Sequence, residues 1–136
     1  MSDVSRLYEK GGILEKWNSL AEQADPEYGK RLFALLKEEN ILPKELEKLR
    51  FLSVSANGGV REILFTKTLD EEIENLPTKP ENKPMIIASD IASINYQVPE
   101  FTNVNFVRLK ADAYGLPLPK EAVDVIYDRM GAIWYK

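Results

Sequence analysis

Four short apolar runs in the second half of the chain constrain its fold most. Each is largely apolar and partly β-branched, and none alternates cleanly between apolar and polar residues. This pattern is typical of strands that are buried on both faces of a parallel sheet. The runs are Phe51–Ser55, Met85–Ser89, Val104–Leu109 and Val123–Tyr127. We therefore expect an α/β fold with a mainly parallel sheet of about four strands.

Residues 1–50 carry a helical pattern instead. Apolar residues between positions 13 and 24 recur at the three-and-four spacing of one helical face. A second helix is expected to follow, because Asp25 can cap its exposed N–H groups and Pro26 suits its first position. It should end near Asn40, and Pro43 opens a short third helix. We expect residues 1–50 to form a helical cap that packs on residues 51–136 in one compact unit, in preference to a substrate-facing lid.

Composition excludes several classes of chemistry. The 136 residues include no cysteine and no histidine, so thiolate nucleophiles and the usual zinc ligand sets are missing and no metal site is expected. The net charge is −4 and no basic stripe is present, so we expect no nucleic-acid partner and no binding to a membrane surface. No apolar run is long enough to span a membrane, and the N-terminal residues lack a secretory stretch. We expect a cytoplasmic protein.

The segment after the first run supports two interpretations. Asn57-Gly58 is a strong hairpin signal, and Thr68 with Glu71 fits a capping box for a helix starting near Leu69. That combination predicts an antiparallel hairpin in an unrelated α+β module. The alternative is a glycine loop followed by one long helix over residues 60–76. Apolar residues keep helical spacing across the supposed break: Phe65, Leu69, Ile73 and Leu76.

The rest of the chain favours the long helix. The segment Phe51–Gly59 ends in a glycine-containing loop, and Met85–Asp90 ends in an acid. The third run is followed by Asp112, Leu116 and Pro117. An Asp-Arg pair follows the fourth run. In this order and spacing, residues 50–136 resemble the front part of a class I S-adenosylmethionine-dependent methyltransferase. The resemblance implies a Rossmann-like doubly wound sheet with strand order 3-2-1-4.

The same resemblance implies S-adenosylmethionine as cofactor. The family's glycine loop lets the backbone approach the methionine moiety, and the matching positions are Ser53, Ser55, Asn57 and Gly59. Asp90, with Ile91 beside it, is expected to accept hydrogen bonds from both ribose hydroxyls. Asp112, with Ala113 beside it, is expected to accept one from the adenine amino group.

Asp128 and Arg129 are the residues that the resemblance places on the substrate side. The pair is similar to that of small-molecule and thiol methyltransferases. The sulfonium cofactor already carries its leaving group, so the protein mainly has to align the acceptor with the methyl group. Such a reaction requires neither histidine nor cysteine.

The chain departs from the family pattern in two ways. Ser53 occupies the place of an acid, Ser55 and Asn57 occupy those of glycines, and only Gly59 fits. The segment that resembles the family also lacks the back half of the full family fold. The fourth strand would therefore lie at the edge of the sheet. We expect a homodimer, a larger homo-oligomer or a partner to cover that edge.

Two functions follow. The first is a methyltransferase, or the cofactor-binding part of one, that acts on a small molecule. The second is a non-catalytic, methyltransferase-derived binding or structural module that associates with itself through the fourth strand.

Overall fold

Four strands and two α-helices make up the described part of the chain. The computed structural model describes residues 26–54, 59–90, 98–111, 118 and 122–128. In chain order the elements are α3 (Tyr28–Glu38), the 3₁₀ helix η1 (Leu46–Lys48), β1 (Arg50–Val54), α4 (Val60–Glu74), β2 (Met85–Asp90), β3 (Asn105–Lys110) and β4 (Val125–Asp128). The predicted helix over residues 13–24 lies outside the described residues.

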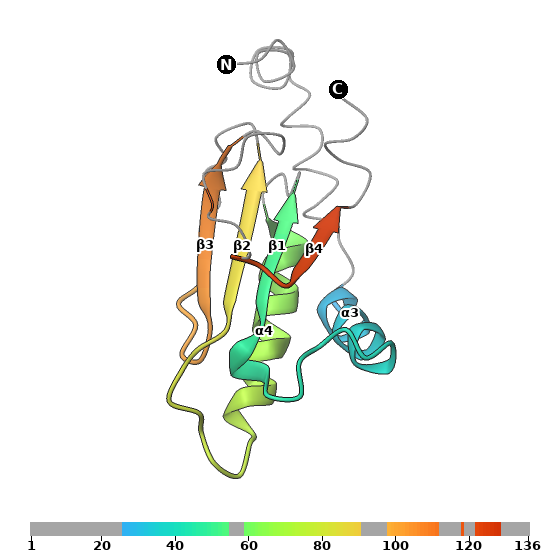
Figure 1. Ribbon diagram of the computed structural model, residues 1–136, viewed down its shortest axis with the longest axis vertical. Helices are drawn as coiled ribbons and strands as arrows, with labels where there is room; N and C mark the ends of the chain where they lie inside the picture. Colours follow the sequence, from blue (N-terminus) through green and yellow to red (C-terminus); the bar gives the residue numbers. More distant parts are fainter. Residues whose placement is uncertain (1–25, 55–58, 91–97, 112–117, 119–121, 129–136) are drawn as a thin grey trace.

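The sheet is parallel throughout and has the order β3-β2-β1-β4. All four arrows in Figure 1 point in the same direction. β1 is central: Phe51 pairs with Ile86 of β2 on one side and with Val125 of β4 on the other. The predicted α/β fold and its strand order are confirmed.

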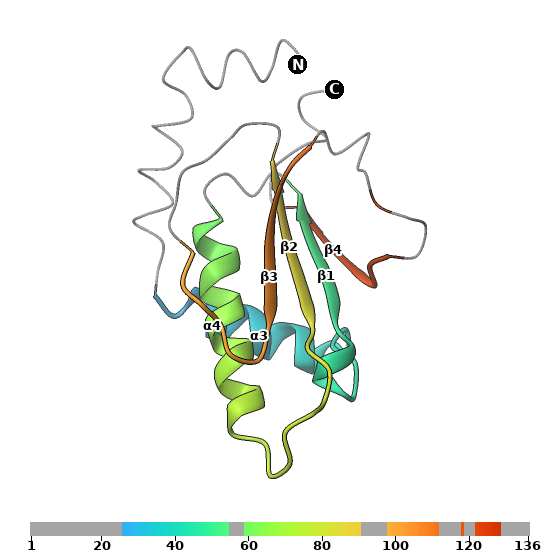
Figure 2. The same ribbon diagram turned by 90° about the vertical axis from the view of Figure 1, so that its left-hand side faces the viewer.

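The main core lies between one face of the sheet and the helices. Figure 2 shows α4 running along the sheet, and α3 crosses close to it. The buried side chains of this core come from both helices, from the sheet and from the loops that enter it: Phe33, Leu36, Leu49, Phe51, Phe65, Leu69, Ile73, Ile86 and Val104. The helix α3 contributes Phe33 and Leu36 to this core.

The opposite face of the sheet is covered less completely. Leu52, Val54 and Ile87 are buried there, and Leu118 and Val123 pack against them. At the two edge strands, however, Val107 is 41% exposed and Ile126 is 66% exposed. Burial on both faces therefore holds for the two central strands, while the edge strands each leave a large apolar side chain at the surface.

The hairpin interpretation is wrong. Val60–Glu74 is one α-helix, so Val60–Phe65 does not fold back on β1. Thr68 is an interior helical residue, because its Oγ1 donates to the Leu64 carbonyl 3.2 Å away instead of capping a new helix. The helical spacing of the apolar residues predicted this helix correctly, since Phe65, Leu69 and Ile73 are all buried in the core.

The helix boundaries also differ slightly from expectation. α3 begins at Tyr28, two residues after Pro26, and its N-cap is Glu27, which makes no side-chain capping bond. Asp25, the expected cap, lies outside the described residues. The third predicted helix is a single 3₁₀ turn, Leu46–Lys48.

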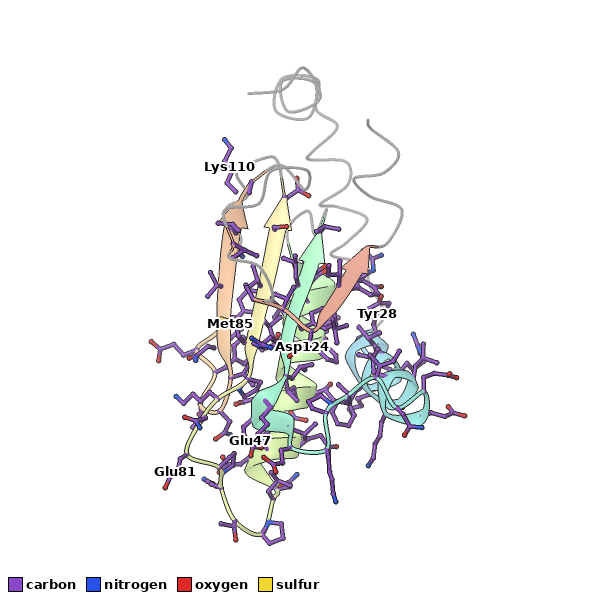
Figure 3. All side chains as sticks on the ribbon, in the orientation of Figure 1. Tyr28, Glu47, Glu81, Met85, Lys110 and Asp124 are labelled. Carbon is purple, nitrogen blue, oxygen red and sulfur yellow. The ribbon has the colours of Figure 1, made fainter. Side chains whose placement is uncertain are left out.

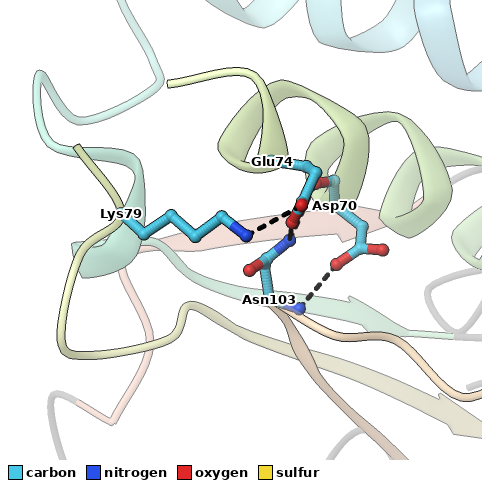
Figure 4. Close-up of polar contacts among 4 residues, drawn as sticks. All are labelled: Asp70, Glu74, Lys79 and Asn103. Atoms are coloured by element: carbon cyan, nitrogen blue, oxygen red, sulfur yellow. Dashed lines mark hydrogen bonds and ion pairs between the residues drawn. The ribbon is translucent and has the colours of Figure 1, made fainter. Parts of the chain in front are cut away.

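A polar cluster joins the second half of α4 to the loop before β3. The backbone N–H of Asn103 donates to Asp70 Oδ1 at 2.6 Å, and its side-chain amide donates to Glu74 Oε2 at 2.9 Å. Lys79 Nζ donates to Glu74 Oε1 at 2.8 Å, as Figure 4 shows. The bonds from Lys79 and from the Asn103 side chain lower the pKa of Glu74, with the Lys79 bond as the largest cause. The cluster fixes α4 at the end far from its first turn.

None of the helices in the described ranges is long and apolar enough to cross a membrane.

Gly29 is where α3 and α4 come closest. A Cβ added at Gly29 would lie 2.2 Å from the backbone oxygen of Leu64, a distance that real Cβ contacts essentially never reach. The neighbour is backbone in the middle of α4, so it cannot move aside as a flexible side chain would.

We therefore expect Gly29→Ala to lower the free energy of unfolding by about 1–3 kcal/mol, the usual cost of overpacking. Helix propensity alone would favour alanine by about 1 kcal/mol. Urea unfolding measures the change, and Ala34→Gly at an exposed position of α3 gives the propensity effect separately. A Gly29→Ala protein as stable as the wild type would contradict the close approach.

Candidate functional site

The carboxyl ends of the four strands lie at one edge of the sheet. In an open parallel sheet, ligands bind outside this edge. In Figure 3, Lys110 marks it at the end of β3, whereas Met85 and Asp124 lie toward the amino ends of β2 and β4. Because α4 follows β1 and runs back along the sheet, its first turn also lies at the carboxyl edge.

Ser53 and Glu62 form a buried pair at this edge. Ser53 is the fourth residue of β1 and is 1% exposed, and Glu62 stands in the first turn of α4 and is 6% exposed. The Ser53 Oγ donates a hydrogen bond to Glu62 Oε1 at 2.9 Å. A carboxyl group is thus present beside the first strand, but it comes from the helix and not from the strand position where the family has its acid.

The second oxygen of Glu62 has no partner among the described residues. Oε2 is buried and makes no hydrogen bond within that part of the chain. Burial is the largest cause of a raised pKa for Glu62, and the nearby charge of Asp90 raises it further. The hydrogen bond from Ser53 and the charge of Arg61 act in the opposite direction. A buried polar atom without a partner is rare in native proteins and calls for a specific explanation.

Asp90 ends β2 at the same edge. It is 8% exposed, and its Cα pairs with Lys110 of β3. Its backbone oxygen accepts a hydrogen bond from the Ala111 N–H at 2.9 Å. The Asp90 carboxylate therefore lies close enough to Glu62 for its charge to raise the pKa of the Glu62 carboxyl group.

Gly59 provides the turn into α4. Its φ is +78°, a left-handed conformation that L side chains rarely adopt, and its carbonyl accepts the first helical bond from Ile63 at 2.8 Å. A Cβ here would meet Ala88 and Phe106 only at ordinary contact distance, 3.9 Å. The requirement for glycine at this position is thus conformational and does not come from a lack of space.

A polar aromatic group lies beside Glu62. The hydroxyl groups of Tyr28 on α3 and Tyr127 on β4 are hydrogen-bonded to each other. The Arg61 guanidinium lies 5.7 Å from the centre of the Tyr28 ring, within the range of a cation–π interaction. Tyr28, Arg61, Glu62 and Tyr127 line the same narrow space between the two helices and the sheet. This group fixes α3 and β4 next to the site.

The structure brings together three of the sequence-predicted site residues: Ser53, Gly59 and Asp90. The backbone of Asp128 ends β4 and pairs with Val54 at the same edge, as the resemblance implied. The other predicted site residues lie outside the described residues: Ser55, Asn57, Ile91, Asp112, Ala113 and Arg129.

Sequence reasoning missed Glu62. It stands three residues before Phe65 and seven before Leu69, which places it on the buried face of α4. That spacing was the available signal, because a carboxyl on the apolar face of a helix is either paired or functional. Its partner Ser53 is visible only once α4 is packed on β1.

A groove of about 590 Å³ lies at the other end of the molecule, between the ends of α3 and α4 and residues 42–47. Its charged lining residues mix lysines with acids: Lys37, Lys44, Glu45, Glu47 and Glu72. These charges define no single ligand chemistry. Among the described residues, no group of three or more acids is arranged to hold a metal ion.

No family model, curated protein or solved structure shows significant similarity to this chain. The fold is therefore established from the structure alone, and the methyltransferase resemblance of residues 50–136 stays a prediction.

We expect Glu62→Gln to raise the free energy of unfolding at neutral pH by about 1 kcal/mol, because it removes a buried ionisable group without a full set of partners. The folded state holds the Glu62 proton more tightly than the unfolded state, whose carboxyl has an ordinary pKa near 4.5. Wild-type stability should therefore fall as pH rises above that value, until the raised pKa is passed. The Glu62→Gln variant should lack this part of the pH dependence.

Urea unfolding across a pH series measures the effect, with Glu72→Gln on the exposed side of α4 as the matched control. Equal pH profiles for the wild type and the Glu62→Gln variant would show that Glu62 titrates alike in both states.

Proposed function

We propose that this chain is a cytoplasmic, class I S-adenosylmethionine-dependent methyltransferase-like protein, or the cofactor-binding part of one, acting on a small molecule. The observation that carries the proposal is the position of Asp90. Asp90 ends β2, which pairs with β1, and it lies at the same edge of the sheet as the Gly59 turn that precedes α4. A carboxylate at this place suits the two hydroxyls of a ribose, which need adjacent acceptor oxygens.

The hydrogen-bond acceptors of the site fit such a cofactor. S-adenosylmethionine offers ribose hydroxyls and an ammonium group as donors, and it also carries a carboxylate on the carbon that bears the ammonium group. Asp90 and Glu62 supply carboxyl oxygens at the edge, one of which, Glu62 Oε2, has no hydrogen-bond partner in the described ranges. The cofactor would bring both the methyl group and its leaving group. The protein would then bind the nucleoside, hold it against Gly59 and align an acceptor near the end of β4.

The end of β4 is the place that we propose for the acceptor. There Asp128 pairs with Val54, the residue that follows Ser53 on the central strand β1. Asp128 and Arg129 keep the roles that the resemblance implies: they would position the substrate, and neither would be required to break a bond in it.

One observation favours the second candidate, a non-catalytic module that associates with itself. Ile126 on the edge strand β4 is 66% exposed, and an apolar edge is a common site of strand pairing. Ser53 in place of the family's acid supports the same interpretation. Under this proposal, β4 of one copy would pair with β4 of a second copy.

We expect S-adenosylhomocysteine, the demethylated product, to shift the amide signals of Ser53, Gly59 and Asp90 in two-dimensional NMR spectra. Asp90→Asn should weaken the binding about tenfold or more, because a charged acceptor of hydrogen bonds is lost. Asp124→Asn is the control, since Asp124 is an exposed carboxylate toward the amino ends of the strands, where it pairs with Arg50. The absence of any shift at millimolar ligand would contradict the proposed function.

We expect sedimentation velocity to show a dimer whose population grows with protein concentration. Ile126→Lys should shift the equilibrium toward the monomer, because it puts a charge on the edge strand. Val107→Lys, on the opposite edge strand β3, serves as the matched control. A monomer at every concentration would exclude self-association through β4.

A further inference from the structure

The first turn of α4 combines features that oppose each other electrostatically. A glycine turn leading into a helix N-terminus usually forms a binding site for phosphate, because the free N–H groups and the helix dipole favour an anion. α4 has this form, with Gly59 at φ +78° before a helix of 15 residues. Yet Glu62 lies in that first turn and Asp90 lies nearby, and both side chains are buried.

We infer that Glu62 selects ligands by charge at this edge, so that nucleosides carrying an amine bind and anionic or phosphorylated ones are excluded. The inference rests on the proposed function in one respect, namely that an adenosine-type ligand occupies the edge between Gly59 and Asp90. It assigns a role to a residue that the methyltransferase resemblance does not include.

The unpartnered oxygen carries the inference. Ser53 holds Oε1 of Glu62 at 2.9 Å and so fixes the direction of the carboxyl group. Oε2 is left buried without a hydrogen bond to any residue that the structure describes, in a side chain that is only 6% exposed. An ammonium group that reached Oε2 would supply the missing donor and would stabilise the carboxylate form.

An anion would meet the reverse situation. A phosphate or carboxylate at the same place would face two acids, and a like charge in a buried site is strongly unfavourable. The nearest described base on α4, Arg61, lies over the Tyr28 ring at 5.7 Å. Lys110 at the end of β3 is an exposed base, and neither Arg61 nor Lys110 is hydrogen-bonded to Glu62 Oε2.

The experiment uses four adenosine ligands and the 136-residue chain. Three are 5′-thioadenosines of matched length that end in an aminopropyl, a propyl or a carboxyethyl group, and the fourth is 5′-AMP. Calorimetry should show the wild type binding the amine tighter than the neutral propyl compound by about tenfold, as for a charged hydrogen bond. The two anionic ligands should bind most weakly.

Glu62→Gln should remove this discrimination. The glutamine side chain keeps the shape of the glutamate and an acceptor for Ser53, so we expect the affinity for the propyl compound to stay within about twofold of the wild type. The amine should lose about tenfold, and the anionic ligands should gain by a similar factor. Glu72→Gln, exposed on the same helix, should change none of the four affinities.

Two results would overturn the inference, and they can be told apart. If the propyl compound binds but Glu62→Gln leaves the ratio of amine to propyl affinity unchanged, Glu62 does not select by charge and the proposed function stands. If no ligand of the series binds the wild type, the proposed function fails and the inference fails with it. A role of Glu62 in folding alone would weaken all four ligands equally, so the ratio separates selection from structure.

Discussion

The pairing of β1 with a parallel strand on each side is the constraint on which the rest of the structure depends. Phe51 pairs with both Ile86 and Val125, and most of the strand is buried. Parallel neighbours cannot be joined by a tight turn, so the chain has to cross back over the sheet between them. α4 is that return between β1 and β2. The first turn of the helix and the ends of the strands must then meet at one edge, which is how Ser53, Glu62 and Asp90 come together. Core and site are two results of the same pairing.

The strands could be predicted because burial on both faces leaves a trace in the sequence. Phe51–Val54 and Ile86–Asp90 are buried at every position, which removes the polar alternation of a half-exposed strand. The Asn57-Gly58 signal misled for the opposite reason, since it reports only local turn preference. Val60–Glu74 gains more from burying Phe65 and Ile73 against the sheet than a two-residue turn offers. The edge strands were the least predictable, because the exposure of Val107 and Ile126 depends on what covers them.

The site was only half visible in the sequence. Asp90 could be singled out because the family resemblance implies an acid at the end of the second strand. Glu62 could not be assigned a role in this way, since its partner Ser53 is nine residues earlier and the contact exists only after α4 packs on β1. The family resemblance placed a carboxylate on the strand, whereas the structure supplies one from the helix. Resemblance at single sequence positions does not reveal such a difference.

The hydrogen bond between Tyr28 and Tyr127 joins residues 99 positions apart, the first described helix and the last described strand. During synthesis on the ribosome, α3 and β1 emerge long before β4, so the central strand has one open side while the nascent chain grows. That side is a row of unpaired backbone groups next to Phe51 and Leu52, which is a typical target for chaperones and for misassembly. Only when Val125–Asp128 has left the exit tunnel can β1 gain its second neighbour and Tyr28 its partner. The pairing of β4 with β1 therefore follows the synthesis of every other described strand.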